Sequence, residues 1–96
     1  MKVRYSRRAL VELDAILTDL SEKNPAAAQG FATRIRAVIE RIGLFPEGFQ
    51  AVAERPGVRR VALVRYPYLF FYKVIASEVL ILRVVHGARK EPWENL

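Results

Sequence analysis

The sequence predicts an α+β domain in which an antiparallel helical hairpin packs on one face of an antiparallel β-sheet, in the order β-α-α-β-β-β. Apolar residues recur every three or four positions through the first half of the chain, which is typical of amphipathic helices. After Gly57 the pattern changes to segments rich in β-branched and aromatic residues, which is typical of strands. A chain of 96 residues buries a single core, so we expect one domain over residues 1–96.

The first half of the chain is expected to form a short strand and two helices. Residues 2–5 are a strand candidate, and Ser6 is a suitable N-cap for a helix over residues 7–22. An Asn-Pro pair at residues 24–25 begins a second helix, which Gly43 is expected to end. The apolar stripes are Leu10, Leu13, Ile16, Leu17 and Leu20 in the first helix and Phe31, Ile35, Val38, Ile39 and Ile42 in the second.

The second half is expected to form a loop and a three-stranded meander. Residues 44–57 contain two Pro and two Gly and are expected to form the loop. The predicted strands and turns are residues 58–65, a turn at 66–67, residues 68–75, a turn at 76–78 and residues 79–85.

Alternation along these strands assigns two faces to the sheet. The face expected to pack on the helices is wholly apolar or aromatic: Phe70, Tyr72, Val74, Leu80, Leu82 and Val84. The second face mixes basic with large apolar residues: Arg59, Val61, Leu63, Arg65, Leu69, Phe71, Lys73, Ile75, Val79, Ile81, Arg83 and Val85. We expect this face to be open and to need a partner. The alternative is that the 44–57 loop and the C-terminal tail fold across it.

The net charge of +6 is concentrated in the second half of the chain. Residues 55–96 contain eight basic and three acidic residues, whereas residues 1–54 contain eight and seven. This excess suggests a polyanionic or an acidic protein partner. The alternative is a modest charge that only keeps a small domain in solution.

Composition excludes several kinds of chemistry. The chain has no Cys and one His, which excludes disulfides, a thiol nucleophile and Cys-rich or multi-His metal sites. We expect no metal and no cofactor. The apolar stretches are far shorter than the ~20 residues of a membrane-spanning helix, and the N-terminus lacks the apolar segment of a signal peptide. We therefore expect a small cytoplasmic protein without a membrane partner.

The catalytic alternatives depend on His86 and the basic residues. The serines have no nucleophile-elbow pattern and no Asp follows Asp19, so a serine-type triad is not expected. Metal-free RNA cleavage stays open, because Arg and Lys can hold a phosphate while Tyr, His, Lys or Glu transfers the proton. The basic groups for it, equally suited to an acidic protein segment, are Arg59, Arg65, Lys73, Arg83, Arg89 and Lys90.

Several motifs, taken in order, resemble a known family. They are Val3-Arg4-Tyr5-Ser6, the helix from Ala9 to Leu20 with Asp14, Phe45-Pro46-Glu47-Gly48, Val58-Arg59-Arg60, the strand from Tyr68 to Val74, and the closing segment from Ile81 to Arg89. With the order of elements, they resemble the RelE/ParE superfamily, toxins of bacterial type II toxin–antitoxin modules. The resemblance covers nearly the whole chain.

The resemblance also implies a choice between two activities. RelE-like members cleave mRNA in the ribosomal A site, and ParE-like members inhibit DNA gyrase. RelE-like nucleases typically carry Arg as the second residue of the Tyr-x-Leu/Phe-x-Tyr motif, where this chain has Leu69, and often a tail Tyr, which this chain lacks. Both differences favour a ParE-like toxin that inhibits gyrase by binding, without catalytic residues.

Two alternatives to this prediction stay open. One is a RelE-like, ribosome-dependent mRNA endonuclease that works without metal. The other is an inactive remnant that still binds its antitoxin. In the nuclease, the catalytic candidates would be Arg65, Arg83, His86 and Arg89.

The resemblance implies a cognate ParD-like antitoxin and DNA gyrase as partners, with a role in plasmid stabilisation. It implies a hetero-oligomer with the antitoxin, which alone would contact operator DNA. The antitoxin would wrap its C-terminal segment around the second face, with Leu63, Leu69, Phe71 and Ile81 as anchors. The basic surface for the target is expected to be Arg59, Arg65, Lys73, Arg83, Arg89 and Lys90.

Overall fold

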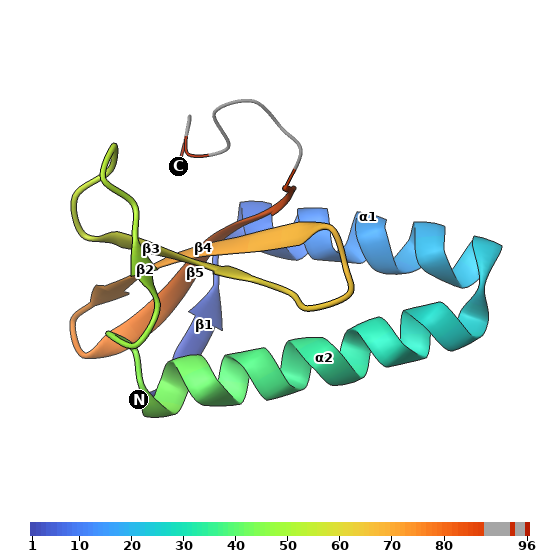
Figure 1. The fold of residues 1–96 in the computed structure, drawn as a ribbon, viewed down its shortest axis with the longest axis horizontal. Helices are drawn as coiled ribbons and strands as arrows, with labels where there is room; N and C mark the ends of the chain where they lie inside the picture. Colours follow the sequence, from blue (N-terminus) through green and yellow to red (C-terminus); the bar gives the residue numbers. More distant parts are fainter. Residues whose placement is uncertain (88–92, 94–95) are drawn as a thin grey trace.

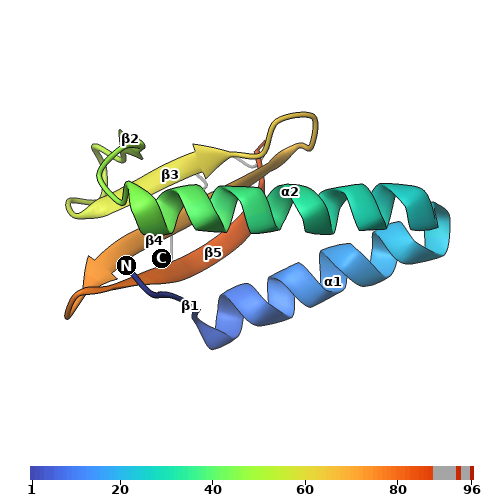
Figure 2. The ribbon, with the colours of Figure 1, turned by 90° about the horizontal axis from the view of Figure 1, so that it is seen from below.

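Two helices cover one face of a five-stranded sheet in the computed structural model, which describes residues 1–87, 93 and 96 (Figures 1 and 2). The spatial strand order is β1-β5-β4-β3-β2, and all neighbours are antiparallel except β1 and β5, which are parallel. The predicted fold class is confirmed; β2 is an additional edge strand. The elements are β1 (Val3–Tyr5), α1 (Arg7–Lys23), α2 (Pro25–Leu44), β2 (Gln50–Ala51), β3 (Val58–Ala62), β4 (Tyr68–Ile75) and β5 (Glu78–His86).

The helices begin where the capping residues predict. The Ser6 hydroxyl accepts a hydrogen bond from the Ala9 amide at 3.0 Å, and the Asn24 side chain accepts one from the Ala27 amide at 3.2 Å. The predicted end at Gly43 is wrong, because α2 continues to Leu44. A Cβ at Gly43 would lie 2.9 Å from the Met1 carbonyl oxygen, so this glycine allows the chain start to approach the helix. No described helix is long and apolar enough to cross a membrane.

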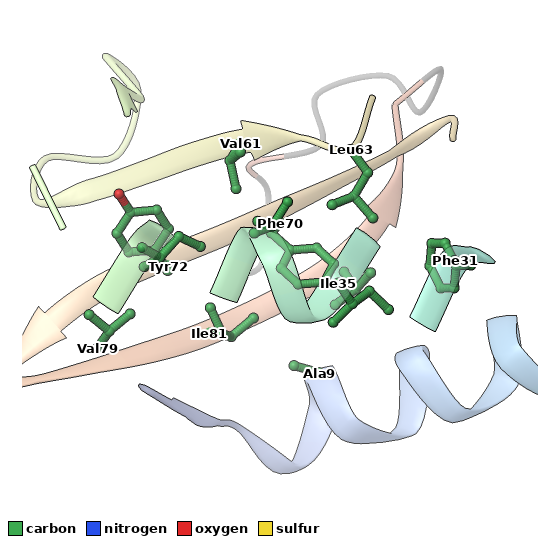
Figure 3. Packing of buried hydrophobic residues seen from close by; sticks show 12 residues of the cluster. Ala9, Phe31, Ile35, Val61, Leu63, Phe70, Tyr72, Val79 and Ile81 are labelled. Atoms are coloured by element: carbon green, nitrogen blue, oxygen red, sulfur yellow. The ribbon is translucent and has the colours of Figure 1, made fainter. Parts of the chain in front are cut away.

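The main core lies between the helices and the sheet (Figure 3). Both predicted helical stripes pack there, except Leu10, which is 51% exposed. The buried residues of this cluster are Ala9, Phe31, Ile35, Val38, Ile42, Val61, Leu63, Phe70, Tyr72, Val79, Ile81 and Val84.

The predicted faces of the sheet are partly wrong because the two hairpins fix a different register. Val61 pairs with Phe70, so the odd-numbered residues of β3 share a face with the even-numbered residues of β4. The two-residue Ala76–Ser77 turn pairs Ile75 with Glu78, which places β5 in the same relation to β4. Cross-strand partners share a face. Val61, Leu63, Val79 and Ile81 therefore face the helices rather than the second face, as does Arg59, whereas Leu80 faces away from the helices.

A β-bulge at Leu82 changes the alternation once more. Tyr72 pairs with Ile81 but Phe71 pairs with Arg83, so Leu82 has no cross-strand partner. The bulge lets Ile81 and Val84 both enter the main core, while Leu82 packs on the second face, contrary to the prediction. Simple period-two alternation cannot reveal such an extra residue.

The β3–β4 connection is longer than predicted, and the β4–β5 turn is tighter. The Tyr66 amide donates to the Leu63 carbonyl at 3.1 Å, so β3 ends at Ala62 rather than at Arg65. Arg65 has a φ of +74° in this turn. Ala76 and Ser77 have φ values of +49° and +65°, the pattern of a type I′ hairpin turn.

Candidate interaction surfaces

The second face of the sheet carries a small apolar cluster of its own. Its buried residues are Val52, Val58, Phe71 and Val85, with Leu69, Leu82, Trp93 and Leu96 packed against them. This set is called the second cluster below. The expectation that this face is open is wrong in the described chain, because Val52 from the loop and two C-terminal residues cover it, as the alternative proposed. Figure 1 shows the C-terminal end on the side of the sheet away from α2.

Basic side chains border the second cluster. Arg60, Phe71 and Arg83 are cross-strand neighbours in one row across β3, β4 and β5, so the two guanidinium groups share a face with the ring between them. Lys73 lies on this face in the next row, opposite Val58. Arg60 donates to the Gln50 side-chain oxygen at 3.4 Å. This face can therefore offer both cations and apolar area to a partner.

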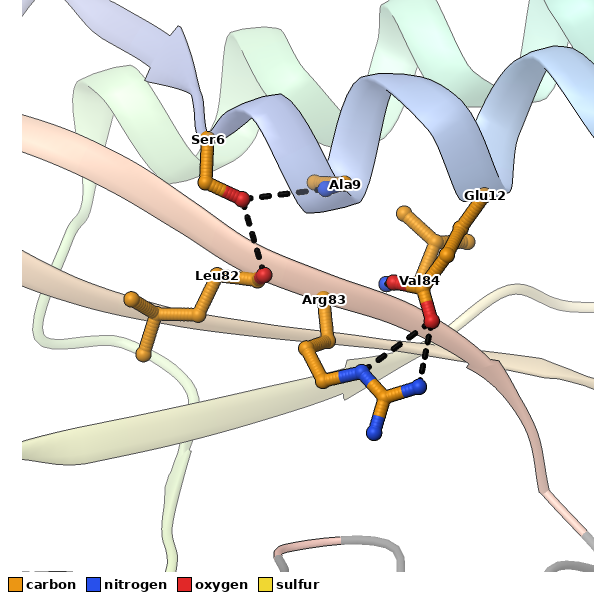
Figure 4. Close-up of polar contacts among 6 residues, drawn as sticks. All are labelled: Ser6, Ala9, Glu12, Leu82, Arg83 and Val84. Carbon is orange, nitrogen blue, oxygen red and sulfur yellow. Dashed lines mark hydrogen bonds and ion pairs between the residues drawn. The ribbon is translucent and has the colours of Figure 1, made fainter. Parts of the chain in front are cut away.

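Arg83 is the one charged residue buried in the described chain, with 3% of its surface exposed. Its Nε donates to Glu12 Oε2 at 3.0 Å, and its Nη2 forms an ion pair with the same oxygen (Figure 4). Glu12 Oε1 accepts a hydrogen bond from the Val84 amide at 3.0 Å. Nη1 of Arg83 is buried without a partner among the described residues. The Arg83 guanidinium is thus buried and paired with Glu12, and it is not an exposed cation.

Because β1 is short, Glu12 supplies a hydrogen-bond acceptor to the part of β5 that lies beyond it. The Ser6 amide donates to the Ile81 carbonyl at 2.9 Å, and the Ser6 hydroxyl donates to the Leu82 carbonyl at 2.9 Å (Figure 4). Beyond this point no strand among the described residues pairs with that edge of β5, and the Glu12 carboxylate from α1 supplies the next acceptor. Side chains of α1 therefore continue the pairing that β1 begins.

Arg59 and Tyr72 fasten the segment that follows α2. Arg59 Nη1 donates to the Phe49 carbonyl at 2.7 Å, and the Tyr72 hydroxyl donates to the Pro46 carbonyl at 2.6 Å. Burial raises the pKa of Tyr72, and the Arg59 charge lowers it in part. Tyr72 is therefore a protonated hydrogen-bond donor at neutral pH. Arg59 faces the helix side of the sheet and does not join the second-face cations.

Arg65 and His86 lie outside the second cluster, in the β3–β4 turn and at the end of β5. Arg65 is exposed in the β3–β4 turn, where it borders a groove along α2. His86 is exposed at the end of β5, with its ring edge-on to Tyr68 at 5.7 Å between centroids. Arg89 and Lys90 lie outside the described residues. The predicted basic surface is thus divided among at least three places in the described chain.

The four predicted antitoxin anchors are also divided. Leu63 and Ile81 are buried in the main core, so their predicted exposure is wrong for the register reason given above. Phe71 has 0% of its surface exposed within the second cluster, and Leu69 is half-buried beside it. Only Leu69 and Phe71 lie on the predicted face.

Three residues of these surfaces were missed by the sequence reasoning. Glu12 pairs with Arg83, Arg60 is one of the second-face cations, and Arg34 lines the groove along α2. Alternation around Phe71 in the correct register would have found Arg60. No sequence signal pairs Glu12 with Arg83, because 71 positions separate them.

The described residues offer no metal centre. They contain no set of three or more His, Cys, Asp or Glu residues that could hold a metal ion. Tyr72 donates to a backbone carbonyl, and Arg83 is bound to Glu12. The second face is suited to binding a chain by apolar area and charge.

Comparison with known proteins agrees with a small two-layer toxin fold. Residues 3–91 match the family described as the ParE toxin of type II toxin–antitoxin systems, parDE. Toxin RelE2 of Caulobacter vibrioides is 34% identical over 89 residues, which are 92% of this chain and 97% of that protein. Y4kP of Sinorhizobium fredii is 30% identical over 95 residues, which are 95% of this chain and 93% of that protein.

A solved structure gives the same result. A chain of the chromosomal ParDE toxin–antitoxin system from P. aeruginosa superposes with a TM-score of 0.76 at 27% identity, covering 90% of this chain and 95% of that chain. This chain therefore belongs to the ParE toxin family of type II toxin–antitoxin systems. Membership implies an antitoxin as its partner.

Proposed function

We propose that this toxin acts in the cytoplasm by binding and inhibiting DNA gyrase, and that a ParD-like antitoxin neutralises it. The supporting observation is the surroundings of Leu69. This residue lies on the second face between its cross-strand neighbours Ala62 and Val85, so its row carries no group that could hold a phosphate. RelE-like nucleases typically have Arg at this position of the motif. The ParE family match points in the same direction.

The second face is the surface that we assign to the target. It combines the Arg60 and Lys73 cations with the aromatic and aliphatic area of the second cluster. Arg83 lies in the row of Phe71, but its guanidinium is buried and paired with Glu12, so we assign the target contact to Arg60 and Lys73. We also assign Arg89 and Lys90, which lie outside the described residues, to this basic surface.

The test separates the two possible targets by measuring DNA and protein synthesis separately. Toxin is induced without antitoxin, and both syntheses are followed by pulse-labelling over the first minutes. We expect DNA synthesis to fall first while translation continues, and the purified toxin to inhibit gyrase supercoiling of a plasmid. Toxin premixed with its antitoxin is the control and should have no effect. An early stop of translation with unaffected supercoiling would instead establish the nuclease alternative.

A pair of variants tests the assigned surface. Replacing Arg60 and Lys73 together with Ala should weaken gyrase inhibition at least tenfold, because both cations border the proposed contact. Arg41→Ala is the matched control, since Arg41 is exposed on α2 and lies outside the second cluster. Equal inhibition by the double variant and the control would exclude this face as the gyrase contact.

A further inference from the structure

A groove runs along α2 on the outside of the molecule, separate from the second face. It has a volume of about 590 Å³ and lies between α2 and the β3–β4 turn. Ala26, Gly30, Thr33 and Ala37 follow one side of the helix and line it. At about 1.5 Å per residue, this floor is roughly 16 Å long. The small side chains of Ala26, Thr33 and Ala37 leave this side of the helix open to a second helix, whereas the Tyr66 hydroxyl lies over Gly30.

Tyr66 lines the groove opposite α2, and aromatic packing fixes its position. The Tyr66 ring packs edge-on to Phe31 at 5.2 Å between centroids, and Phe31 is buried in the main core. Tyr66 also approaches α2 closely, since a Cβ at Gly30 would lie 2.7 Å from its hydroxyl oxygen. The Leu63–Tyr66 hydrogen bond closes the turn. The groove is therefore formed before any partner arrives, which lowers the entropy cost of binding.

The charged residues that line the groove are both basic. Arg34 on α2 and Arg65 on the turn line it, and none of its lining residues is acidic. Two guanidinium groups over a floor of small residues are complementary to a helix that carries carboxylates beside small or apolar residues. A nucleic-acid backbone would not use the small-residue floor, which suits close packing of a helix.

The conformation of Arg65 agrees with a binding role. It occupies the third position of a turn closed from Leu63 to Tyr66, with a φ of +74°. Gly or Asn is usual where a turn needs positive φ at this position, because a side chain adds strain. Folding alone would thus favour Gly over Arg here.

We propose that this groove receives an acidic helical segment of the antitoxin, with Arg34 and Arg65 pairing with its carboxylates. The proposal rests on the toxin–antitoxin assignment, but not on gyrase as the target. It assigns antitoxin recognition to α2 and leaves the second face for the target.

The experiment measures the affinity of the purified toxin for the antitoxin encoded beside its gene. Arg65→Gly removes the cation and keeps the turn, so affinity should fall about tenfold with an unchanged or higher melting temperature. Arg34→Ala should lose a similar factor, and Ala37→Trp should block the groove sterically. Arg41→Ala, on the same helix but outside the groove, is the control and should bind like the original chain. The salt dependence of binding should be weaker in both arginine variants than in this control.

Growth arrest and oligomeric state complete the test. Ala37→Trp expressed alone should still arrest growth, and the antitoxin should no longer prevent the arrest. Unchanged antitoxin affinity in all three groove variants would overturn the proposal, as would Ala37→Trp losing toxicity while keeping antitoxin affinity. Self-association of the original chain that Ala37→Trp abolishes would make the groove a contact between two copies instead. If the original chain itself fails to bind the antitoxin, the underlying toxin–antitoxin assignment fails.

Discussion

The two faces of the sheet both bury aromatic side chains, but different parts of the chain cover them. On the helix side, α1 and α2 seal a cluster that includes Phe70 and Tyr72. On the other side, Phe71 is covered by a loop residue, Val52, and by Trp93 and Leu96 from the C-terminal end. A surface covered by irregular segments can be uncovered at lower cost than one covered by two capped helices. The helix side therefore holds the fold together, and the second face is the better suited to contacts with a partner.

The largest expected effect comes from the helix side. Phe70→Ala should lower the free energy of unfolding by about 4–5 kcal/mol, because it opens a cavity that the two helices and the neighbouring strands β3 and β5 cannot close. Urea denaturation measures the change. A loss below about 2 kcal/mol would mean that the main core can rearrange around the missing ring.

The ion pair at the edge of β5 should rank second. Glu12→Ala should cost about 3 kcal/mol, because it leaves the buried Arg83 guanidinium unpaired and the Val84 amide without its acceptor. Asp14→Ala is the matched control on the exposed side of the same helix, and it should change stability by less than about 0.5 kcal/mol. Equal losses of stability for the two variants would show that the contacts of Glu12 with Arg83 and Val84 do not stabilise the fold.

The second face should respond less to the same truncation. Phe71→Ala should cost about 2–3 kcal/mol, less than Phe70→Ala, because Val52 and Trp93 can move into the space. Comparing the two Phe variants in one denaturation series tests the difference between the faces directly. An equal or larger loss for Phe71→Ala would show that the second cluster is as rigid as the main core.

The smallest effect should be a gain at the β4–β5 turn. Ser77→Gly should raise stability by about 0.5–1 kcal/mol, because Ser77 has a φ of +65° and glycine adopts such angles without strain. Ser21→Gly, at an exposed position in α1, should lower stability by a similar amount. Thermal melts of the two variants should therefore shift in opposite directions; a loss for Ser77→Gly would show that its side chain stabilises the turn.

Local signals predicted much of the fold. Ser6 and Asn24 begin the helices as expected because a cap requires only a side chain and an amide three residues away. The sheet faces were harder to predict, since they depend on register. A two-residue turn at Ala76–Ser77 and a bulge at Leu82 together decide which residues of β5 reach the core. Neither feature has a Gly or Asn-Gly signal in this sequence.

The candidate sites likewise combine features that the sequence reveals with features that it does not. The excess of basic residues after residue 54 and the interleaving around Phe71 were visible in the sequence. The sequence did not reveal that Glu12 would hold Arg83 or that Arg65 would stand beside α2 with Arg34. Such pairs join residues that are far apart along the chain.

The sequence by itself determined the class of fold, the helix starts, the main apolar stripes and the family resemblance, because each depends on periodicity, capping or motif order within short segments. Only the tertiary structure decided which strand residues face the helices, that the second face is covered, and that the basic residues serve separate surfaces. The physical reason is that register and edge pairing are fixed by hydrogen bonds between distant segments, and a shift of one residue moves every following side chain to the other face.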